Sequence, residues 1–594
     1  MNAPLNFWRS GLATITAMVC IGIPVETQKL GAQPNEGTEI VPNVQLNNEQ
    51  LAVRFLDQAT AGATPADVAS LSAALTAHPD TAFSDWLNAQ YALPVNPGDL
   101  SYTTVQALKD ATIRTQVNQS LYGKAGVLRG SLMISDNTNE LRRQIAYALS
   151  QIFVISDQDN DLGGAVEGMS QWYDLLYKDA FSDFSTILHD VTYHPAMAEF
   201  LSLDGNAKAG FYNANSRPDE NYAREVMQLF TIGLVQLNSD GSTVVDAKGH
   251  AIPTYSQPEI TEVARVFTGL KRPVGDTLAH RKGKDGKEAF MYTKRPVSFG
   301  RDVIDEKRHD TGPKTFLGQT LPAGQDTAKD IDDTLQILCQ HPNAGPFFAR
   351  GMIQRLVTSN PSPAYIKRVA QVFVSSKGDM KTVISAILLD DEARNLSHAL
   401  QPEYGKLREP WLRVTQLSRG FQAQPEPNAR YFTPNGKYMI NKLGQYPLSA
   451  PSVFNFYLPN YQSPGVVTKR NANAIDATNL LVDPEFQILN SNTALLTPNF
   501  LMDLLRAEPG KLRPNSGLWT LDLTPQVKLA KDPAALVENV NTLLVGGMMS
   551  DRTRTIITRA VGEFTPDNDP EILKERARTA IYLTMNSPDY AVQK

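Results

Sequence analysis

The spacing of apolar residues is the feature that most constrains the fold of this chain. From Asn48 onward, apolar residues recur at intervals of three and four, as on one face of an α-helix. The clearest segment is NTNELRRQIAYALSQIFVIS (137–156), whose apolar stripe consists of Leu141, Ile145, Ala148, Leu149, Ile152 and Phe153. Such a stripe is stable only when it packs against other elements. We therefore predict a mainly α protein with one large multi-helix core.

Changes in composition divide the chain into parts. Residues 34–47 are polar and predict a linker, and residues 48–234 predict an N-terminal helical part. Residues 235–320 are rich in Gly, Pro and Lys, which indicates a loop-rich insertion with short β-strands around one helix in SQPEITEVARVFTGL (256–270). Residues 321–594 are again helical and are predicted to pack on the same core. No period of 20–50 residues recurs, which argues against a solenoid.

The N-terminus has the pattern of a secretory signal peptide. Arg9 precedes a moderately apolar run from Gly11 to Val25, and the small residues Gly31 and Ala32 follow. We predict that residues 1–33 are a signal peptide and that the protein is exported, to the periplasm or the extracellular space. The alternative is an N-terminal helix in a cytosolic protein. No later run reaches about 18 apolar residues, so no membrane span is expected after the leader.

Composition and motifs exclude several classes of protein. The net charge is −6, without the basic stripe that nucleic-acid binding needs, so no nucleic-acid partner is predicted. Two cysteines cannot build a disulfide framework. Asp157, Asp159 and Asp161 fit three positions of a calcium loop, but Leu162 and Gly168 replace its required Gly and Glu. The usual motifs of serine hydrolases, P-loop NTPases and dinucleotide-binding enzymes are missing from the sequence.

The segment RPDENYAREVMQLFTIG (217–233) predicts a helix with an unusual polar face. Asp219 is a good residue to accept a hydrogen bond from the first turn. Asn221, Arg224 and Glu225 are spaced to share one face, and Glu220 and Arg224 form an i, i+4 pair. The face is either a solvated surface with one ion pair or a hydrogen-bonded polar site. Its mixture of acid, amide and Arg, without Lys, favours the polar site.

The second polar segment is RHDTGPKTFLG (308–318), in which His309, Asp310 and Lys314 surround a Gly-Pro turn. Histidine titrates nearest to neutral pH, and lysine supplies a compact positive charge. The segment therefore suits acid–base chemistry or anion binding. The alternative is a polar turn packed on the domain.

These segments resemble one bacterial family, the domain of unknown function 1800. The resemblance extends from about residue 50 to the end of the chain, and the segments that carry it include PDENYAREVMQLFTIGL (218–234), EITEVARVFTGL (259–270), HDTGPKTFLG (309–318) and QYPLSAPSVFNFYLPNY (445–461). It implies a large, exported, mainly helical protein of unassigned role. Members often occur beside a second exported family that resembles the alkaline phosphatase and sulfatase group.

The resemblance also points to individual residues. The family motif Pro-x-Glu-Asn-x-Ala-Arg-Glu is matched at Glu220, Asn221, Arg224 and Glu225, and the motif His-Asp-x-Gly-x-Lys is matched at His309, Asp310, Gly312 and Lys314. Gln228 stands where many members carry Glu, and Phe230 stands where some carry His. The resemblance therefore gives no support here to a mechanism that needs those two groups.

Together these observations lead to one hypothesis, in which both segments line a shared cleft. The protein would be a hydrolase that acts on a polysaccharide or another envelope polymer, since paired carboxyls in separate environments are a common hydrolytic arrangement. The predicted catalytic residues are Glu220, Glu225, His309 and Asp310. The predicted substrate-binding residues are Asn221, Arg224 and Lys314.

Two alternatives stay open at this point. One is a non-catalytic envelope protein that binds or scaffolds a partner, such as the exported phosphatase- or sulfatase-like protein. The other is a metal site with Glu225, His309 and Asp310 as ligands, which would suit calcium, magnesium or manganese because its donors are rich in oxygen. Apart from such a divalent cation, no cofactor is predicted.

Overall fold

The computed structural model describes residues 45–95, 139–159, 162–163, 166–271, 279–282, 288–291, 302–424, 436–472, 480–511 and 519–594. All of them belong to one unit, Val44–Lys594. The predicted signal peptide (1–33), most of the predicted linker, and Asp161 of the calcium-like loop lie outside the described residues.

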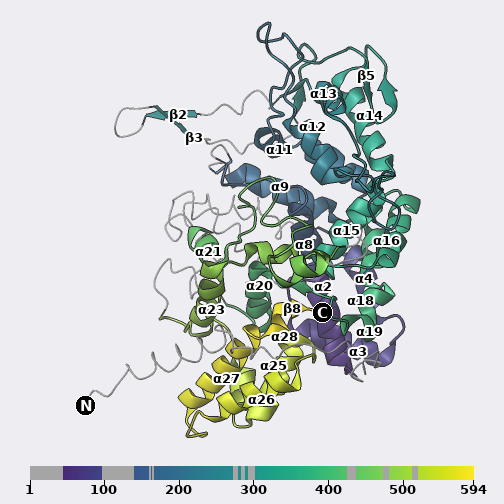
Figure 1. Ribbon diagram of the computed structural model, residues 1–594. Coiled ribbons are helices and arrows are strands. Elements are labelled where there is room, and N and C mark those ends of the chain that lie inside the picture. Colours follow the sequence, from purple (N-terminus) through teal and green to yellow (C-terminus); the bar gives the residue numbers. More distant parts are fainter. Residues whose placement is uncertain are drawn as a thin grey trace. The chain divides into compact units, whose positions relative to one another are not determined.

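Helices dominate the described residues, which confirms the mainly α prediction (Figure 1). Thr64 illustrates how the sequence sets a helix start: its Oγ1 accepts a hydrogen bond from the backbone N of Asp67 at 3.1 Å, and Pro65 takes the first helical position. The helices before residue 201 are α2 (Asn48–Ala59), α3 (Pro65–Ala77), α4 (Ala82–Ala92), α8 (Glu140–Ser150), α9 (Val166–Lys178), η2 (Asp179–Phe181), α10 (Phe184–Thr192) and α11 (Pro195–Phe200).

The middle of the chain combines short helices with antiparallel hairpins, as predicted for a loop-rich insertion with short strands. Its helices are α12 (Asn221–Glu225), the π-helix η3 (Val226–Thr231) and α13 (Gln257–Val266). The paired strands are β1 (Leu270–Lys271) with β4 (Val303–Ile304), β2 (Ala279–Lys282) with β3 (Glu288–Met291), and β5 (Lys314–Phe316) with β6 (Gln319–Leu321). Helix α13 packs against α12 on one side and strand β5 on the other (Figure 1).

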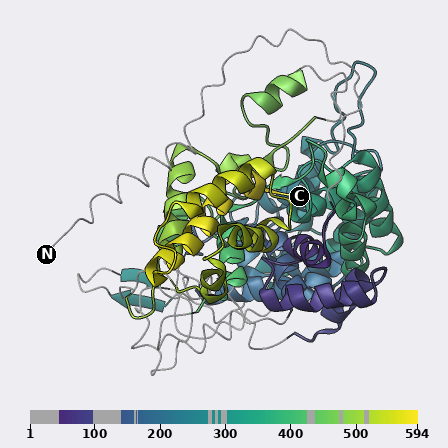
Figure 2. The ribbon, with the colours of Figure 1, turned by 90° about the horizontal axis from the view of Figure 1, so that it is seen from below.

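The remaining elements are again mostly helices. The first group comprises α14 (Thr327–Gln340), α15 (Ala344–Leu356), α16 (Pro363–Ser375), α17 (Met380–Leu388), α18 (Asp391–Arg394), α19 (Leu396–Ala399) and the strand β7 (Lys406–Leu407). The second group comprises α20 (Pro410–Gly420), α21 (Gly436–Leu443), α22 (Val466–Ala472), η4 (Pro484–Ile488), α23 (Ser491–Leu505), α24 (Thr524–Leu529), α25 (Pro533–Val545), α26 (Asp551–Gly562), α27 (Pro570–Met585), α28 (Pro588–Ala591) and β8 (Val592–Gln593). In Figure 2 the helices α25, α26 and α27 form the yellow group at the C-terminal end. Strand β8 pairs with β7 and joins the end of the chain to residue 406.

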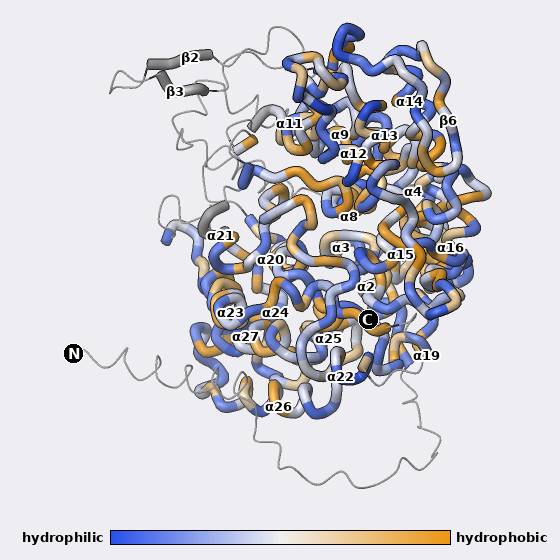
Figure 3. The backbone as a smooth tube through the Cα atoms, turned by 45° about the horizontal axis from the view of Figure 1, so that its top comes forward, coloured by the Kyte–Doolittle hydropathy of each residue, from blue (hydrophilic) through white to orange (hydrophobic). Residues whose placement is uncertain are grey.

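The buried apolar side chains form two clusters. The first is built from residues between Ala52 and Leu448 and includes Trp172, Tyr222 and Phe230. The second is built from residues 411–590 together with Tyr147 of α8. Apolar and polar stretches alternate along the helices, as amphipathic helices require (Figure 3). Within the described residues, no helix combines the length and the apolar character that a membrane span needs. The segments 217–233 and 308–318 both belong to the part of the fold around α13.

Candidate functional site

Helix α12 begins where the sequence predicts. The Asp219 Oδ1 accepts a hydrogen bond from the backbone N of Asn221 at 2.8 Å, which satisfies one free N–H group of the first turn. Tyr222 is buried in the first core, whereas Asn221 is exposed. Directly after Glu225 the helix widens into the π-helix η3, an uncommon form that often accompanies functional sites.

The Glu220 carboxylate joins α12 to the start of α13. Its Oε2 accepts hydrogen bonds from Arg224 Nη2 at 3.2 Å and from Gln257 Nε2 at 2.8 Å. Its Oε1 accepts a hydrogen bond from Thr261 Oγ1 at 2.8 Å. Gln257 and Thr261 are one turn apart on α13, and both are exposed. The carboxylate is therefore held in one position by three donors, yet remains at the protein surface.

Glu225 has a different environment, although the α-helical period puts it on the same face as Asn221 and Arg224. It is only 5% exposed, and its Oε2 has no hydrogen-bond partner among the described residues. Burial raises the pKa of Glu225 from 4.5 to about 7, against the opposing effect of the Arg224 charge. Glu225 is therefore a carboxyl group that exchanges its proton near neutral pH.

Tyr255 lies close to Glu225, in the loop before α13. Its hydroxyl also lacks a hydrogen-bond partner within the described part of the chain. Burial and the nearby charge of Glu225 raise the pKa of Tyr255 to about 12. An unpartnered carboxyl oxygen and an unpartnered hydroxyl close together form an incomplete polar site, because buried polar groups are normally paired. We call the following residues the carboxylate cluster: Glu220, Arg224, Glu225, Tyr255, Gln257 and Thr261.

A pair of tyrosine variants tests whether the Tyr255 hydroxyl contributes to the stability of the fold. Tyr222→Phe removes a buried hydrogen bond of 2.7 Å to Thr192 Oγ1 and is expected to cost about 1 kcal/mol of unfolding free energy. Tyr255→Phe removes a hydroxyl without a partner and is expected to stay within about 0.5 kcal/mol of the wild type. Denaturant unfolding of both variants measures the difference. An equal loss in both would show that Tyr255 is bonded within the fold.

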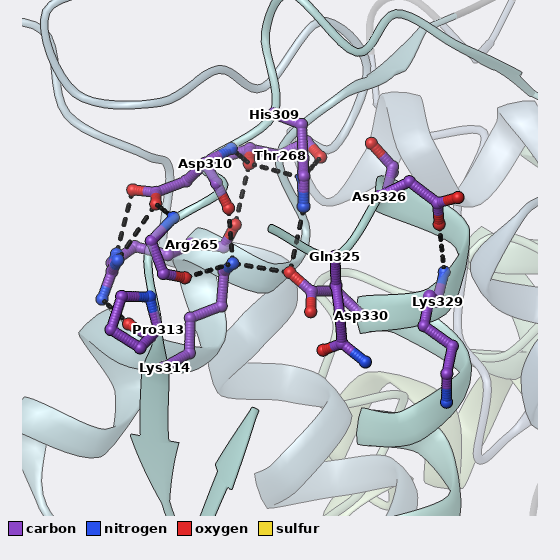
Figure 4. A network of polar contacts seen from close by, with 12 residues as sticks. Arg265, Thr268, His309, Asp310, Pro313, Lys314, Gln325, Asp326, Lys329 and Asp330 are labelled. Atoms are coloured by element: carbon purple, nitrogen blue, oxygen red, sulfur yellow. Dashed lines mark hydrogen bonds and ion pairs between the residues drawn. The ribbon is translucent and has the colours of Figure 1, made fainter. Parts of the chain in front are cut away.

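The His309 segment is packed inside the protein (Figure 4). His309 is 0% exposed. Its Nδ1 lies 2.8 Å from the carbonyl oxygen of Thr268, and its Nε2 lies 3.0 Å from Asp330 Oδ2. The buried Lys314 Nζ donates to the same Asp330 oxygen at 2.5 Å and to the carbonyl oxygens of Gly312 and Asp310. Both ring nitrogens and the ammonium group are thus bonded to protein atoms, an arrangement typical of a structural lock.

Asp310 connects these buried residues to helix α13. Arg265 donates to both carboxylate oxygens of Asp310, from Nε at 2.9 Å and from Nη2 at 3.0 Å. This planar two-bond contact fixes the orientation of both groups. Arg265 also donates to Glu262 Oε2 at 2.8 Å and to the carbonyl oxygen of Pro313 at 3.0 Å. We call His309, Asp310, Lys314, Arg265 and Asp330 the buried lock.

Helix α13 connects the two predicted segments. Gln257 and Thr261, in its first turns, bind Glu220, whereas Arg265, in its last turn, binds Asp310. The structure thus places Glu220, Arg224 and Glu225 in one group and His309, Asp310 and Lys314 in another. Asn221 contributes its backbone N to the cap, and its side chain is exposed. The catalytic and binding roles predicted for these residues stay predictions.

Sequence reasoning missed five members of the two groups, namely Tyr255, Gln257, Thr261, Arg265 and Asp330. Asp330 lies on the face of α14 that buries Ile331, Leu335 and Leu338, and an acid on an apolar helix face was the available signal. Arg265 lies on α13, and nothing in its sequence neighbours distinguishes it from an ordinary surface residue. No pattern in the sequence singles out Tyr255, because its position near Glu225 depends on the path of the loop before α13.

The three residues of the metal alternative are not gathered at one place in the described structure. Among the described residues, no group of three or more His, Cys, Asp or Glu side chains is placed to hold a metal ion. Glu225, His309 and Asp310 are all described, and they do not form such a group.

Comparison with known proteins agrees with the resemblance found in the sequence. Residues 54–592 match the family model described as "Protein of unknown function (DUF1800)". No curated protein and no solved structure matches the chain. The matched residues cover nearly the whole chain and include both the carboxylate cluster and the buried lock. The chain therefore belongs to the DUF1800 family.

Proposed function

We propose that this protein is an exported hydrolase that cleaves a polysaccharide or another envelope polymer at the carboxylate cluster. The observation that supports this most is Glu225, whose carboxyl has a pKa near 7 and an oxygen without a partner. A proton donor works best when its pKa lies near the working pH. The proposed export, to the periplasm or the extracellular space, rests on the apolar segment from Gly11 to Val25.

The two carboxyl groups of the cluster suit different roles. Glu225 is buried and exchanges a proton near neutral pH, so it would protonate the leaving group. Glu220 is held by three donors at the surface and would face the substrate as a carboxylate. The exposed side chains of Asn221 and Gln257 would bind substrate hydroxyls, and Arg224 would hold Glu220 in position.

The residues of the buried lock would act indirectly. Their hydrogen bonds fix the C-terminal end of α13, whose first turns carry Gln257 and Thr261. We therefore assign His309, Asp310 and Lys314 a positioning role in place of contact with the substrate. This assignment is supported by the 0% exposure of His309 and the bonding of both its ring nitrogens.

A polymer screen tests the proposal. The purified full chain would be incubated with a panel of bacterial envelope polysaccharides, and new reducing ends would be counted. Glu225→Gln keeps the shape of the side chain and is the matched inactive control. Cleavage by the wild type that is lost in this variant supports the proposal, whereas cleavage retained in Glu225→Gln contradicts the role given to Glu225.

The second candidate is a non-catalytic envelope protein that binds or scaffolds a partner, such as an exported phosphatase- or sulfatase-like protein. The buried lock favours it, because a charge network centred on buried groups is a common structural device. Binding of a polymer or of this partner without any cleavage, and without any effect of Glu225→Gln, would support this second function.

A further inference from the structure

A polar cavity lies away from the carboxylate cluster, where the end of the chain meets helix α2. Its volume is about 340 Å³, within the range of small-molecule sites. One part of its wall is apolar and comes from Leu400, Pro402, Val545, Met548, Pro588 and Val592. The charged and phenolic part comes from Arg54, Asp57, Tyr404, Arg408, Asp589 and Lys594.

Not every charged group at this cavity has a partner of opposite charge among the described residues. Arg408 Nη2 binds Asp57 Oδ2 at 2.8 Å, so these two lining residues neutralise each other. Asp589 accepts hydrogen bonds from the backbone N and the hydroxyl of Ser550 at 2.9 and 2.8 Å. Arg54 forms no ion pair with any acid of the described chain, although it is only 4% exposed. A buried guanidinium without a counter-charge is costly unless something else supplies the negative charge.

The cationic group extends from Arg54 to Arg394. Arg54 Nη1 donates to the carbonyl oxygen of Arg394 at 2.9 Å, and the guanidinium group lies beside the Tyr404 hydroxyl. Arg394 donates to Gln58 and packs against the rings of Phe55 and Phe83. Burial and the charge of Arg54 lower the pKa of Arg394 to about 9. Two guanidinium groups are therefore held together against their mutual repulsion.

The nearest hydrogen-bonding and acidic groups do not supply a negative charge to Arg54. Tyr404 lines the cavity and its hydroxyl lies beside the Arg54 guanidinium, but a neutral hydroxyl supplies no negative charge. Asp390 is bound to Arg368 at 2.7 Å. Glu392 accepts hydrogen bonds from the backbone N and the hydroxyl of Ser362. Both acids are therefore already bonded to residues at or near helix α16 and are not paired with Arg54.

We propose that this cavity binds a small organic anion, with its carboxylate or phosphate group held by Arg54 and Tyr404 and its apolar body against the apolar part of the wall. An oxyanion would supply the negative charge that the Arg54 guanidinium lacks, and guanidinium groups bind carboxylate and phosphate strongly. Leu400, Val545 and Met548 offer the apolar surface for the body of the ligand.

Calorimetric titration of the full chain with phenyl phosphate, benzoate and benzyl alcohol tests this site. The two anions and the neutral alcohol share an aromatic ring, so only the anionic group differs. Binding of either anion, with benzyl alcohol at least about tenfold weaker, is expected because hydrogen bonds to charged groups contribute about 1.5–3 kcal/mol. Failure of both anions to bind, or equal binding of the alcohol, would overturn the proposal.

Two variants assign the binding to the named residues. Arg54→Met keeps the length of the side chain and is expected to weaken anion binding at least about tenfold, without lowering the melting temperature of the ligand-free protein. Tyr404→Phe removes only the hydroxyl beside Arg54 and is expected to fold normally and to bind the anion more weakly. Arg552→Met, at an exposed position of α26, is the matched control. Unchanged anion affinity in both Arg54→Met and Tyr404→Phe would exclude this site.

Discussion

Replacing Asp330 with alanine is expected to lower the unfolding free energy by about 3–5 kcal/mol, the cost of removing one partner of a buried ion pair. Asp330 Oδ2 binds the Lys314 ammonium group at 2.5 Å and His309 Nε2 at 3.0 Å, and these three side chains are at most 1% exposed. The variant leaves a buried ammonium group with no carboxylate. Denaturant unfolding monitored by circular dichroism measures the loss.

Two further variants make this result specific. Lys329→Ala removes an exposed ion pair to Asp333 on the same helix, α14, and is expected to cost less than about 1 kcal/mol. Lys314→Met combined with Asp330→Leu replaces the charges by apolar groups and is expected to recover part of the loss. If Asp330→Ala is no more destabilising than Lys329→Ala, the buried lock does not stabilise the fold.

Replacing Glu225 with glutamine is expected to reduce polymer cleavage by about 10²–10⁴-fold, the usual contribution of a positioned proton donor. The polymer is the one identified by the screen described above. Glutamine cannot release a proton, but it keeps the size of the side chain. Stability at pH 5 is expected to change little, because Glu225 is then mostly protonated and neutral. Glu563→Gln, at an exposed position, is the control and is expected to cleave normally.

The pH dependence of cleavage separates a proton donor from a residue that only shapes the site. The donor must carry its proton, so wild-type activity is expected to fall as the pH rises above about 7. The residual activity of Glu225→Gln is expected to lack this decline. A decline with the same midpoint in both proteins would assign the titrating group to another residue.

Local signals in the sequence predicted much of the fold. The cap at Thr64, the hydrogen bond that Asp219 accepts from the first residue of α12, and helix α13 all depend on residues within a few positions of each other, so spacing alone reveals them. The hairpin of β5 and β6 is likewise a local structure, because only Leu317 and Gly318 separate its two strands.

Contacts between distant residues could not be predicted from the sequence in this way. His309 and Lys314 were recognised as a polar group, but their burial depends on Asp330, a residue of the next helix. A loop that carries His, Asp and Lys has the same composition whether it faces solvent or the protein interior. Only the packing of α13 and α14 decides between the two.

The burial of Glu225 has a similar explanation. The period of 3.6 residues puts it beside Asn221 and Arg224, one of which is exposed and the other partly exposed. A π-helix also begins directly after Glu225, at Val226, and no spacing in the sequence predicts it. The environment of Glu225 also depends on Tyr255, thirty residues later in the chain.

The most direct test of the central claim, that Glu225 titrates near neutral pH, is the unfolding free energy of wild type and Glu225→Gln measured between pH 4 and pH 8. The pKa of Glu225 is raised in the folded state, so its stabilising contribution is complete below its ordinary value of 4.5 and is lost as the pH rises through about 7. The wild type is expected to lose up to about 3 kcal/mol relative to the variant across this range. A difference between the two proteins that stays constant from pH 4.5 to pH 8 would contradict the account.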